Sequence, residues 1–239
     1  RWTPDMRDML VIALPAALSS GVLQINLLVG QLVASGTENA LSWLYAADRL
    51  YQLPLGVVGI AIGIVLLPSL SRSLKAGDDL AAQTALSRAG EAALALTIPA
   101  AVALVVIPVP LVMVLFERGQ TGPSDTQAIA LAVMIYGAGL PAFVLQKVLQ
   151  PLYFAREDTR TPLRYALVSM VVNAAVAIGL AFYIGWLASA VATTLAAWVQ
   201  VALLAAGRRS MGETARFDAR FTQKLWRISA AAGLSGGVM

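Results

Sequence analysis

Long apolar segments separated by short polar links repeat along the whole chain. Six complete segments are long enough for a transmembrane helix, which needs about 20 predominantly apolar residues. The pattern therefore predicts an all-α protein, a polytopic transmembrane bundle of about seven helices, with the last helix starting near Leu225. The six complete spans are predicted at about 9–34, 41–67, 89–116, 127–154, 162–184 and 186–207.

The third span follows a polar link, 71–88, whose last part is predicted to be the amphipathic start of the third helix. Glu91 lies near this entrance, and we expect it to be solvated. Three prolines, Pro99, Pro108 and Pro110, predict that the span is bent, because proline removes a helix hydrogen bond.

Two signals mark the fifth and sixth spans. Thr161 and Pro162 are a favourable N-cap and first helical residue. Gly185 separates the two spans and predicts a tight helical hairpin.

The chain divides into two predicted regions. Residues 1–209 form a transmembrane lobe, and residues 210–239 form a cytoplasmic linker followed by a truncated seventh helix. The linker is basic and contains aromatic residues, so we expect it to lie along the membrane surface. The chain starts in a polar linker without methionine and stops inside an apolar run, which indicates an internal fragment of a longer membrane protein.

Composition supports a membrane protein, since 59% of the residues are hydrophobic and only 13% are charged, against about 25% charged in soluble domains. The chain has no cysteine or histidine, which excludes thiol and imidazole chemistry. The only adjacent acid pairs, Asp78/Asp79 and Glu157/Asp158, lack a second acidic cluster for magnesium. We therefore expect neither enzymatic chemistry nor a cofactor.

The basic residues are distributed unevenly. Fourteen of the 17 lysines and arginines lie in the first linker and in the links after the second, fourth and sixth spans, and only Arg118 lies in the opposite loops. This bias places the basic links in the cytoplasm. Topology thus explains the net charge of +4, and no nucleic-acid partner is expected. Lys147 lies inside a span, near the cytoplasmic end, where snorkelling to the interface explains it.

The most informative polar residue is Arg49, because an arginine inside a membrane span costs at least about 2.5–3.5 kcal/mol on insertion scales. At helical spacing it shares one face with other polar and small residues: Tyr45, Gln52, Gly56, Gly59 and Gly63. One interpretation is a structural ion pair with Asp48 or with an acid on another helix. The other is a phosphate or carboxylate ligand, which the guanidinium fork binds in bidentate fashion.

The rest of this span contains residues typical of a hinge and of close helix packing. Pro54 lies five residues after Arg49 and predicts a bend or hinge. Gly56, Gly59 and Gly63 would let a neighbouring backbone approach closely.

A second polar group lies in the hairpin. Ser189, Thr193 and Gln200 share a stripe that could meet Asn173 of the preceding helix. Hydrogen bonding between the two helices explains these residues, and a monovalent-cation site is the alternative, although it needs more oxygen ligands.

Two long runs carry a resemblance to a known family. ADRLYQLPLGVVGIAIGIVLLPSLSR (47–72) and KVLQPLYFAREDTRTP (147–162) closely resemble the MurJ/MviN family of lipid II flippases, within the multidrug/oligosaccharidyl-lipid/polysaccharide exporter superfamily. The resemblance implies the C-terminal six-helix lobe of a two-lobed transporter, plus most of the first helix of a lipid-tail groove. The N-terminal lobe would then be the missing partner.

The resemblance also implies roles for individual residues. Arg49 would bind the diphosphate of the lipid-linked precursor, with support from Asp48 and Gln52. Asn173 and Thr193 match two positions of a sodium site found in some members. Gly30 and Ala177 stand where two acids of that site are expected.

The implied function is the flipping of lipid II, a peptidoglycan precursor, from the cytoplasmic to the periplasmic leaflet of the bacterial inner membrane by alternating access. Coupling to sodium or to the membrane potential is a further expectation, and the partners would be the lipid-linked precursor and membrane lipids. The alternatives are an O-antigen lipid flippase or drug/cation antiporter of the same superfamily, and a non-transporting membrane scaffold.

Overall fold

The computed structural model describes residues 24, 27–118, 121–212, 217–218, 220–221, 224, 226 and 228. Within these residues every regular element is a helix, which confirms the all-α prediction. Residues 27–34 are helical and precede the longer elements. These are α2 (Ala40–Lys75), α3 (Asp79–Val106), α4 (Pro108–Phe116), α5 (Pro123–Phe154), α6 (Arg160–Ile184), α7 (Leu187–Gly207) and the short 3-10 helix η1 (Arg208–Met211).

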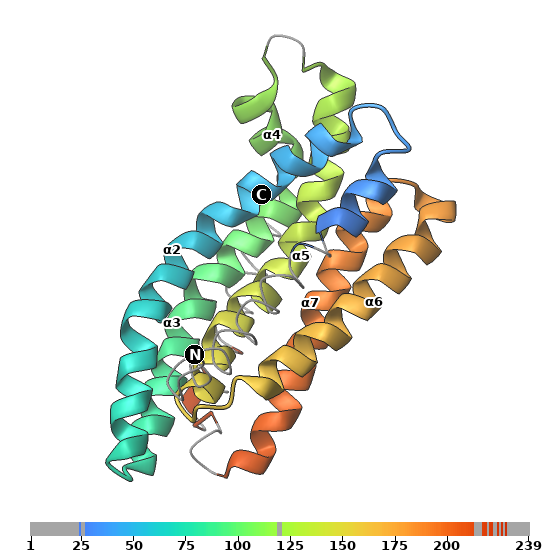
Figure 1. Cartoon of the computed structure of the whole chain (residues 1–239). Helices are drawn as coiled ribbons and strands as arrows, with labels where there is room; N and C mark the ends of the chain where they lie inside the picture. The colour runs from blue at the N-terminus through green and yellow to red at the C-terminus, as the bar shows by residue number, and fades with distance from the viewer. Residues whose placement is uncertain are drawn as a thin grey trace, which may run out of the picture.

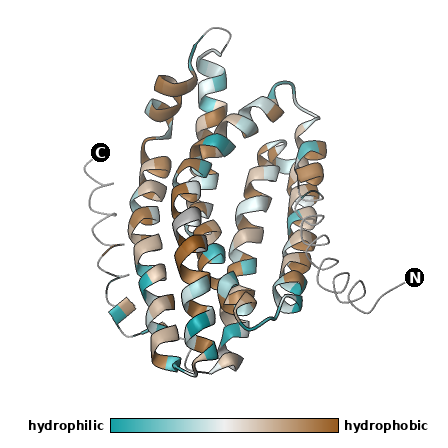
Figure 2. Cartoon of the chain, turned by 60° about the vertical axis from the view of Figure 1, so that its left-hand side comes forward, coloured by the Kyte–Doolittle hydropathy of each residue, from teal (hydrophilic) through white to brown (hydrophobic). Residues whose placement is uncertain are grey.

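Five of these helices, α2, α3, α5, α6 and α7, are long and apolar enough to cross a membrane. Hydrophobic residues cover most of their length, and hydrophilic residues gather mainly near their ends (Figure 2). A polytopic membrane bundle is therefore confirmed. Most of the first predicted span, 9–34, lies outside the described residues. Residues 220 and 221 are already helical, so a helix begins before the predicted Leu225.

Helix α5 is the centre of the bundle, because it packs against α2, α3 and α7. Its buried row follows the i, i+4 spacing of one helix face and includes Leu140, Val144, Val148 and Leu152, all fully buried. Helix α6 packs mainly against α7 and forms the outer edge of the bundle (Figure 1).

The links of the bundle separate into two ends. The α2–α3 turn, the α5–α6 link and the end of α7 lie together at one end, and the α4–α5 link and the α6–α7 turn lie at the other (Figure 1). The basic links after α2, α5 and α7 therefore share one side, while Arg118 belongs to the opposite side. This arrangement agrees with the orientation predicted from the basic residues.

The prediction for the third span was wrong at its start, whereas its predicted end at residue 116 is the end of α4. The polar link between spans is only residues 76–78, because α2 continues to Lys75 and α3 already begins at Asp79. Asp78 caps α3 by accepting a hydrogen bond from the backbone N–H of Ala81, at 2.9 Å. The predicted bend is a break at Ile107, since the residue before a proline disfavours the helical conformation.

The start of α6 also differs from the prediction. The helix begins at Arg160 rather than Pro162, and the capping role that we assigned to Thr161 belongs to Asp158, whose carboxylate accepts a hydrogen bond from the Thr161 backbone N–H. Burial raises the pKa of Asp158, but hydrogen bonds from Thr161 and Arg160 and the charge of Arg164 more than offset this, so its pKa lies below the usual range. Gly185 adopts φ 57° between α6 and α7, which confirms the predicted turn.

Candidate functional site

The polar face predicted around Arg49 lies on the outside of α2. The opposite side of the helix carries core residues such as Leu44, Ala47 and Leu50, which are buried. Tyr45, Arg49, Gln52 and Gly56 are exposed, as their shared helical spacing requires. The side-chain position of Gly63 falls outside the described part of the chain.

No carboxylate among the described residues lies within ion-pair distance of the Arg49 guanidinium. The same holds for hydrogen bonds, since the described contacts include none to this side chain. The structural ion pair that the sequence left open, with Asp48 or with another helix, is therefore not formed in this part of the protein. A cation on an apolar helix is left facing outward.

Asp48, the neighbour of Arg49, points to a different place. It lines a small pocket of about 120 Å³ together with Tyr51 and Tyr136, and with Thr193 of α7. The Gln52 amide donates a hydrogen bond to Asp48 Oδ2, and the Tyr51 hydroxyl also interacts with this carboxylate. Both contacts are to uncharged groups.

The glycines below Arg49 do not meet a neighbouring helix in the described part of the chain. A Cβ placed at Gly56 or Gly59 would have no described atom within 4 Å, so the predicted close approach stays a prediction. Close approach occurs instead on α5, where a Cβ at Gly137 would lie 2.9 Å from Leu104 Cβ of α3. Pro54 lies inside a continuous helix of 36 residues, and its role as a hinge stays a prediction.

The hairpin residues do come together. Asn173 is buried, and its amide donates a hydrogen bond of 3.4 Å to Thr193 Oγ1. This matches the predicted bonding between α6 and α7. The two positions expected to carry acids are occupied by Ala177 and Gly30. Ala177 is fully buried, and a Cβ placed at Gly30 would lie 2.7 Å from Ser189 Oγ. Asn173 and Thr193 supply an amide and a hydroxyl, and Thr193 shares a pocket with Asp48. The sodium site stays a prediction, and no step through sodium is derived.

A second charged cluster, which the sequence did not predict, joins α3 to the C-terminal segment. We call it the α3 clamp. Glu91 is only 8% exposed, and its two carboxylate oxygens pair with Arg88 and Lys224, each at 2.6 Å. Arg88 also lies 3.6 Å from Asp218. The expectation that Glu91 is solvated was therefore wrong, because its second partner lies 133 residues away in the sequence.

Aromatic packing adds to the α3 clamp. Phe217 and Phe221 stack with their ring centroids 4.0 Å apart, and their edges lie against Gly90, where a Cβ would be 2.9 Å from Phe221 and 3.1 Å from Phe217. The Arg208 guanidinium lies 4.3 Å above the Phe217 ring. This part of the predicted membrane-surface linker thus packs on α3.

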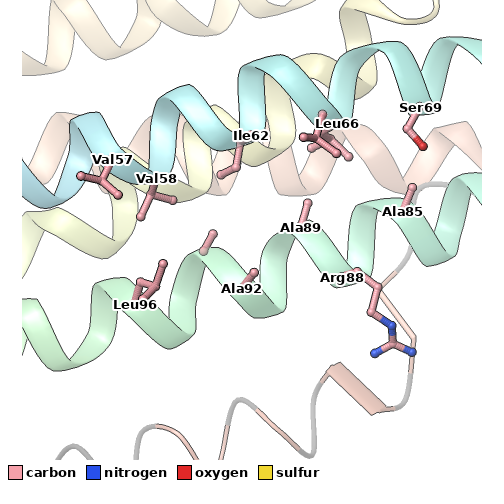
Figure 3. Close-up of a pocket in the computed structure, with 12 residues that line it drawn as sticks. Val57, Val58, Ile62, Leu66, Ser69, Ala85, Arg88, Ala89, Ala92 and Leu96 are labelled. Atoms are coloured by element: carbon pink, nitrogen blue, oxygen red, sulfur yellow. The ribbon is translucent and has the colours of Figure 1, made fainter.

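An apolar groove of about 390 Å³ runs between α2 and α3. Valine, isoleucine and leucine side chains of α2 face alanines of α3 across it, and Arg88 points away from α2 at one end (Figure 3). The groove offers no polar group except at that end, so it is a surface for hydrocarbon rather than for a charged headgroup.

The chain is similar to known flippases along nearly its whole length. The family model described as "Lipid II flippase MurJ" matches residues 1–236. A probable lipid II flippase MurJ of Rhizobium tropici is 47% identical over 85% of this chain and 38% of that relative. Another, of Rhizobium meliloti, is 45% identical over 100% of this chain and 44% of that relative. The chain thus spans less than half the length of these curated relatives.

Solved structures agree on the fold. A lipid II flippase MurJ in an inward closed conformation matches with a TM-score of 0.83 and 24% identity, over 100% of this chain and 50% of that one. An outward-facing multidrug transporter of the MATE family matches with a TM-score of 0.64 and 16% identity, over 93% of this chain and 51% of that one. Both likenesses support the fold alone. With the family model matching residues 1–236, the chain belongs to the lipid II flippase MurJ family.

Proposed function

We propose that this chain is one lobe of a protein that moves lipid II from the cytoplasmic to the periplasmic leaflet of the bacterial inner membrane by alternating access. Membership of the MurJ family supports the substrate. The observation that carries the proposal is Arg49, an exposed cation on an apolar helix that is without a carboxylate partner in the described residues.

Arg49 is suited to the diphosphate of a lipid-linked precursor. A guanidinium binds a phosphate through two parallel hydrogen bonds, and such charge-assisted bonds are stronger than neutral ones. The interaction gains further strength where water is scarce. The diphosphate would neutralise Arg49 while the prenyl chain stays in the hydrocarbon.

The open face below Arg49 would serve the movement. Gly56 and Gly59 leave a surface without side chains, on which a second lobe could pack and shift. We further propose that movement of the charged headgroup draws on the membrane potential, which contributes about 2.3 kcal/mol per elementary charge per 100 mV. Collapsing the potential with valinomycin and potassium should then slow lipid movement in vesicles.

The substitution Arg49→Ala in the full-length protein tests the proposal. We expect the variant to reach normal membrane levels and to fail to sustain growth when the native flippase is depleted. Its affinity for lipid II should fall by about 3 kcal/mol, or roughly a hundredfold, as when one member of a desolvated charge pair is removed.

Arg118→Ala is the matched control, because Arg118 is exposed in the link between α4 and α5 and not on the membrane-spanning part of α2. This variant should sustain growth and bind lipid II normally. Growth supported by Arg49→Ala at normal membrane levels, together with unchanged lipid II binding, would remove Arg49 from the substrate site.

A further inference from the structure

Asp48 and Arg49 are neighbours of opposite charge, and an ion pair between them would leave Arg49 with little attraction for an anion. Side chains of consecutive helical residues project about 100° apart, but a flexible arginine can still reach across such an angle. No salt bridge joins them in the structure, although the Arg49 charge still acts on the Asp48 carboxylate at longer range. Arg49 is exposed, whereas Asp48 is half-buried and lines the pocket with Tyr51 and Tyr136.

Gln52 is the residue that holds Asp48 in this position. It lies one helical turn after Asp48, at the i, i+4 spacing that brings side chains together, and its amide donates to Asp48 Oδ2. Tyr51 contacts the same carboxylate from the side of the pocket. An amide and a phenol bind a carboxylate without cancelling its charge or using the guanidinium.

The described residues on the other faces of the pocket offer Asp48 no competing cation. Among the described residues that line it, Tyr45 and Tyr51 of α2 and Tyr136 of α5 are the only titratable groups besides Asp48 itself. The 27–34 helical segment contributes Gln31, whose amide donates to the Tyr45 hydroxyl at 2.7 Å. Arg49 is therefore the cation that Asp48 would reach if the Gln52 amide were removed.

We infer that Gln52 is a positioning residue for anion binding: it holds the Asp48 carboxylate toward the tyrosine pocket and so keeps the Arg49 guanidinium available to a lipid diphosphate. The inference rests on the proposed function of Arg49. Gln52 acts through Asp48 and needs no contact with the lipid. Loss of the amide should weaken anion binding only while the Asp48 charge is present.

The test uses the full-length protein in detergent micelles with undecaprenyl diphosphate as the probe. Gln52→Leu should weaken binding about fivefold, the factor that corresponds to an ion pair of about 1 kcal/mol. Asp48→Asn should bind at least as tightly as the unmodified protein. The double variant Asp48→Asn/Gln52→Leu should bind like Asp48→Asn, because no carboxylate remains to compete for Arg49.

Gln31→Leu is the control, since it removes an amide from the same pocket without touching Asp48. It should leave probe binding unchanged. Unchanged binding by Gln52→Leu, or a double variant as weak as Gln52→Leu, would overturn the inference; the second result would mean that Gln52 contributes by packing alone. A loss of stability in Gln52→Leu is recognised by its thermal unfolding, and rescue by Asp48→Asn still decides between the two roles.

Arg49→Ala in the same assay separates the inference from the proposed function. If Arg49→Ala binds the probe normally, the proposal that Arg49 binds the diphosphate is wrong. If Arg49→Ala loses binding while Gln52→Leu keeps it, only the inference that Gln52 is a positioning residue is wrong.

Discussion

Glu91 on α3 and Arg49 on α2 are both charged residues on helices apolar enough to cross a membrane, but their surroundings differ. Glu91 is buried, and each of its carboxylate oxygens has a cationic partner at 2.6 Å, from Arg88 and Lys224. Arg49 is exposed and forms no salt bridge with a described residue. Even its neighbour Asp48 is bonded to Gln52.

The difference separates a charge that holds the protein together from one that is available to a ligand. Burying a charge is costly unless it is paired, and the α3 clamp meets this condition with residues of the chain itself. Arg49 lacks such a partner, so its cost in the membrane has to be offset from outside the described part of the chain. A lipid diphosphate would provide this.

Removing Glu91 should have the largest effect on stability. Glu91→Ala leaves Arg88 and Lys224 with Asp218 as the remaining acid of the α3 clamp, and breaking a buried ion pair from one side costs about 3 kcal/mol. We expect a clear fall in the thermal unfolding temperature and faster proteolysis around residues 212–228. Glu38→Ala, at an exposed site in the link before α2, is the control. Equal unfolding temperatures for the two variants would show that the ion pairs do not hold the segment.

Filling the space at Gly90 should have the next largest effect. A side chain there would meet Phe221 and Phe217, and inserting atoms into a packed contact costs about 1–3 kcal/mol. Gly90→Leu should therefore increase amide hydrogen exchange near residues 217–228. Gly56→Leu, with open space around its Cβ in the described lobe, should leave that exchange unchanged. Similar protection of the segment in both variants would contradict the contact.

Much of the fold could be predicted from the sequence, because the length and apolar character of a membrane helix are local properties. The spans now seen as α2, α5, α6 and α7 were predicted in order, and Gly185 marked the hairpin. The break at Ile107 was predicted only as a bend, since three prolines within one span do not say which of them ends a helix. Pro99 lies inside continuous α3.

The sequence predicted the position of some charged and polar site residues and misjudged others. Arg49 and its polar face could be found because an arginine in an apolar segment is costly wherever it occurs. Glu91 was misjudged because Lys224, which neutralises it, comes from a distant part of the chain. The role of Gln52 depends on which way the Asp48 side chain turns, and helical spacing does not determine this.

A smaller effect is expected at the α6–α7 hairpin. Thr193→Val removes the acceptor of the Asn173 amide, and hydrogen bonds between membrane helices are worth about 0.6 kcal/mol on average. The unfolding temperature should fall slightly. Leu195→Ala, at an exposed position of α7, is a control for a substitution on the same helix that removes no hydrogen bond. Sodium at constant ionic strength should stabilise the unmodified protein no more than potassium does. A sodium-specific rise that Thr193→Val abolishes would support the sodium site.

The smallest effect on stability should come from Arg49, in contrast to its effect on lipid binding. Substitutions at exposed residues without partners usually change stability by less than about 0.5 kcal/mol, so Arg49→Ala should unfold at the same temperature as the unmodified protein when no lipid is added. Arg88→Ala is the matched substitution in the α3 clamp and should lower that temperature, because it removes a partner of Glu91. Added undecaprenyl diphosphate should stabilise the unmodified protein and Arg88→Ala but not Arg49→Ala, since a ligand stabilises only the protein that binds it. If Arg49→Ala were the less stable variant without lipid, Arg49 would have a structural partner outside the described residues, and its exposed position would no longer indicate a ligand.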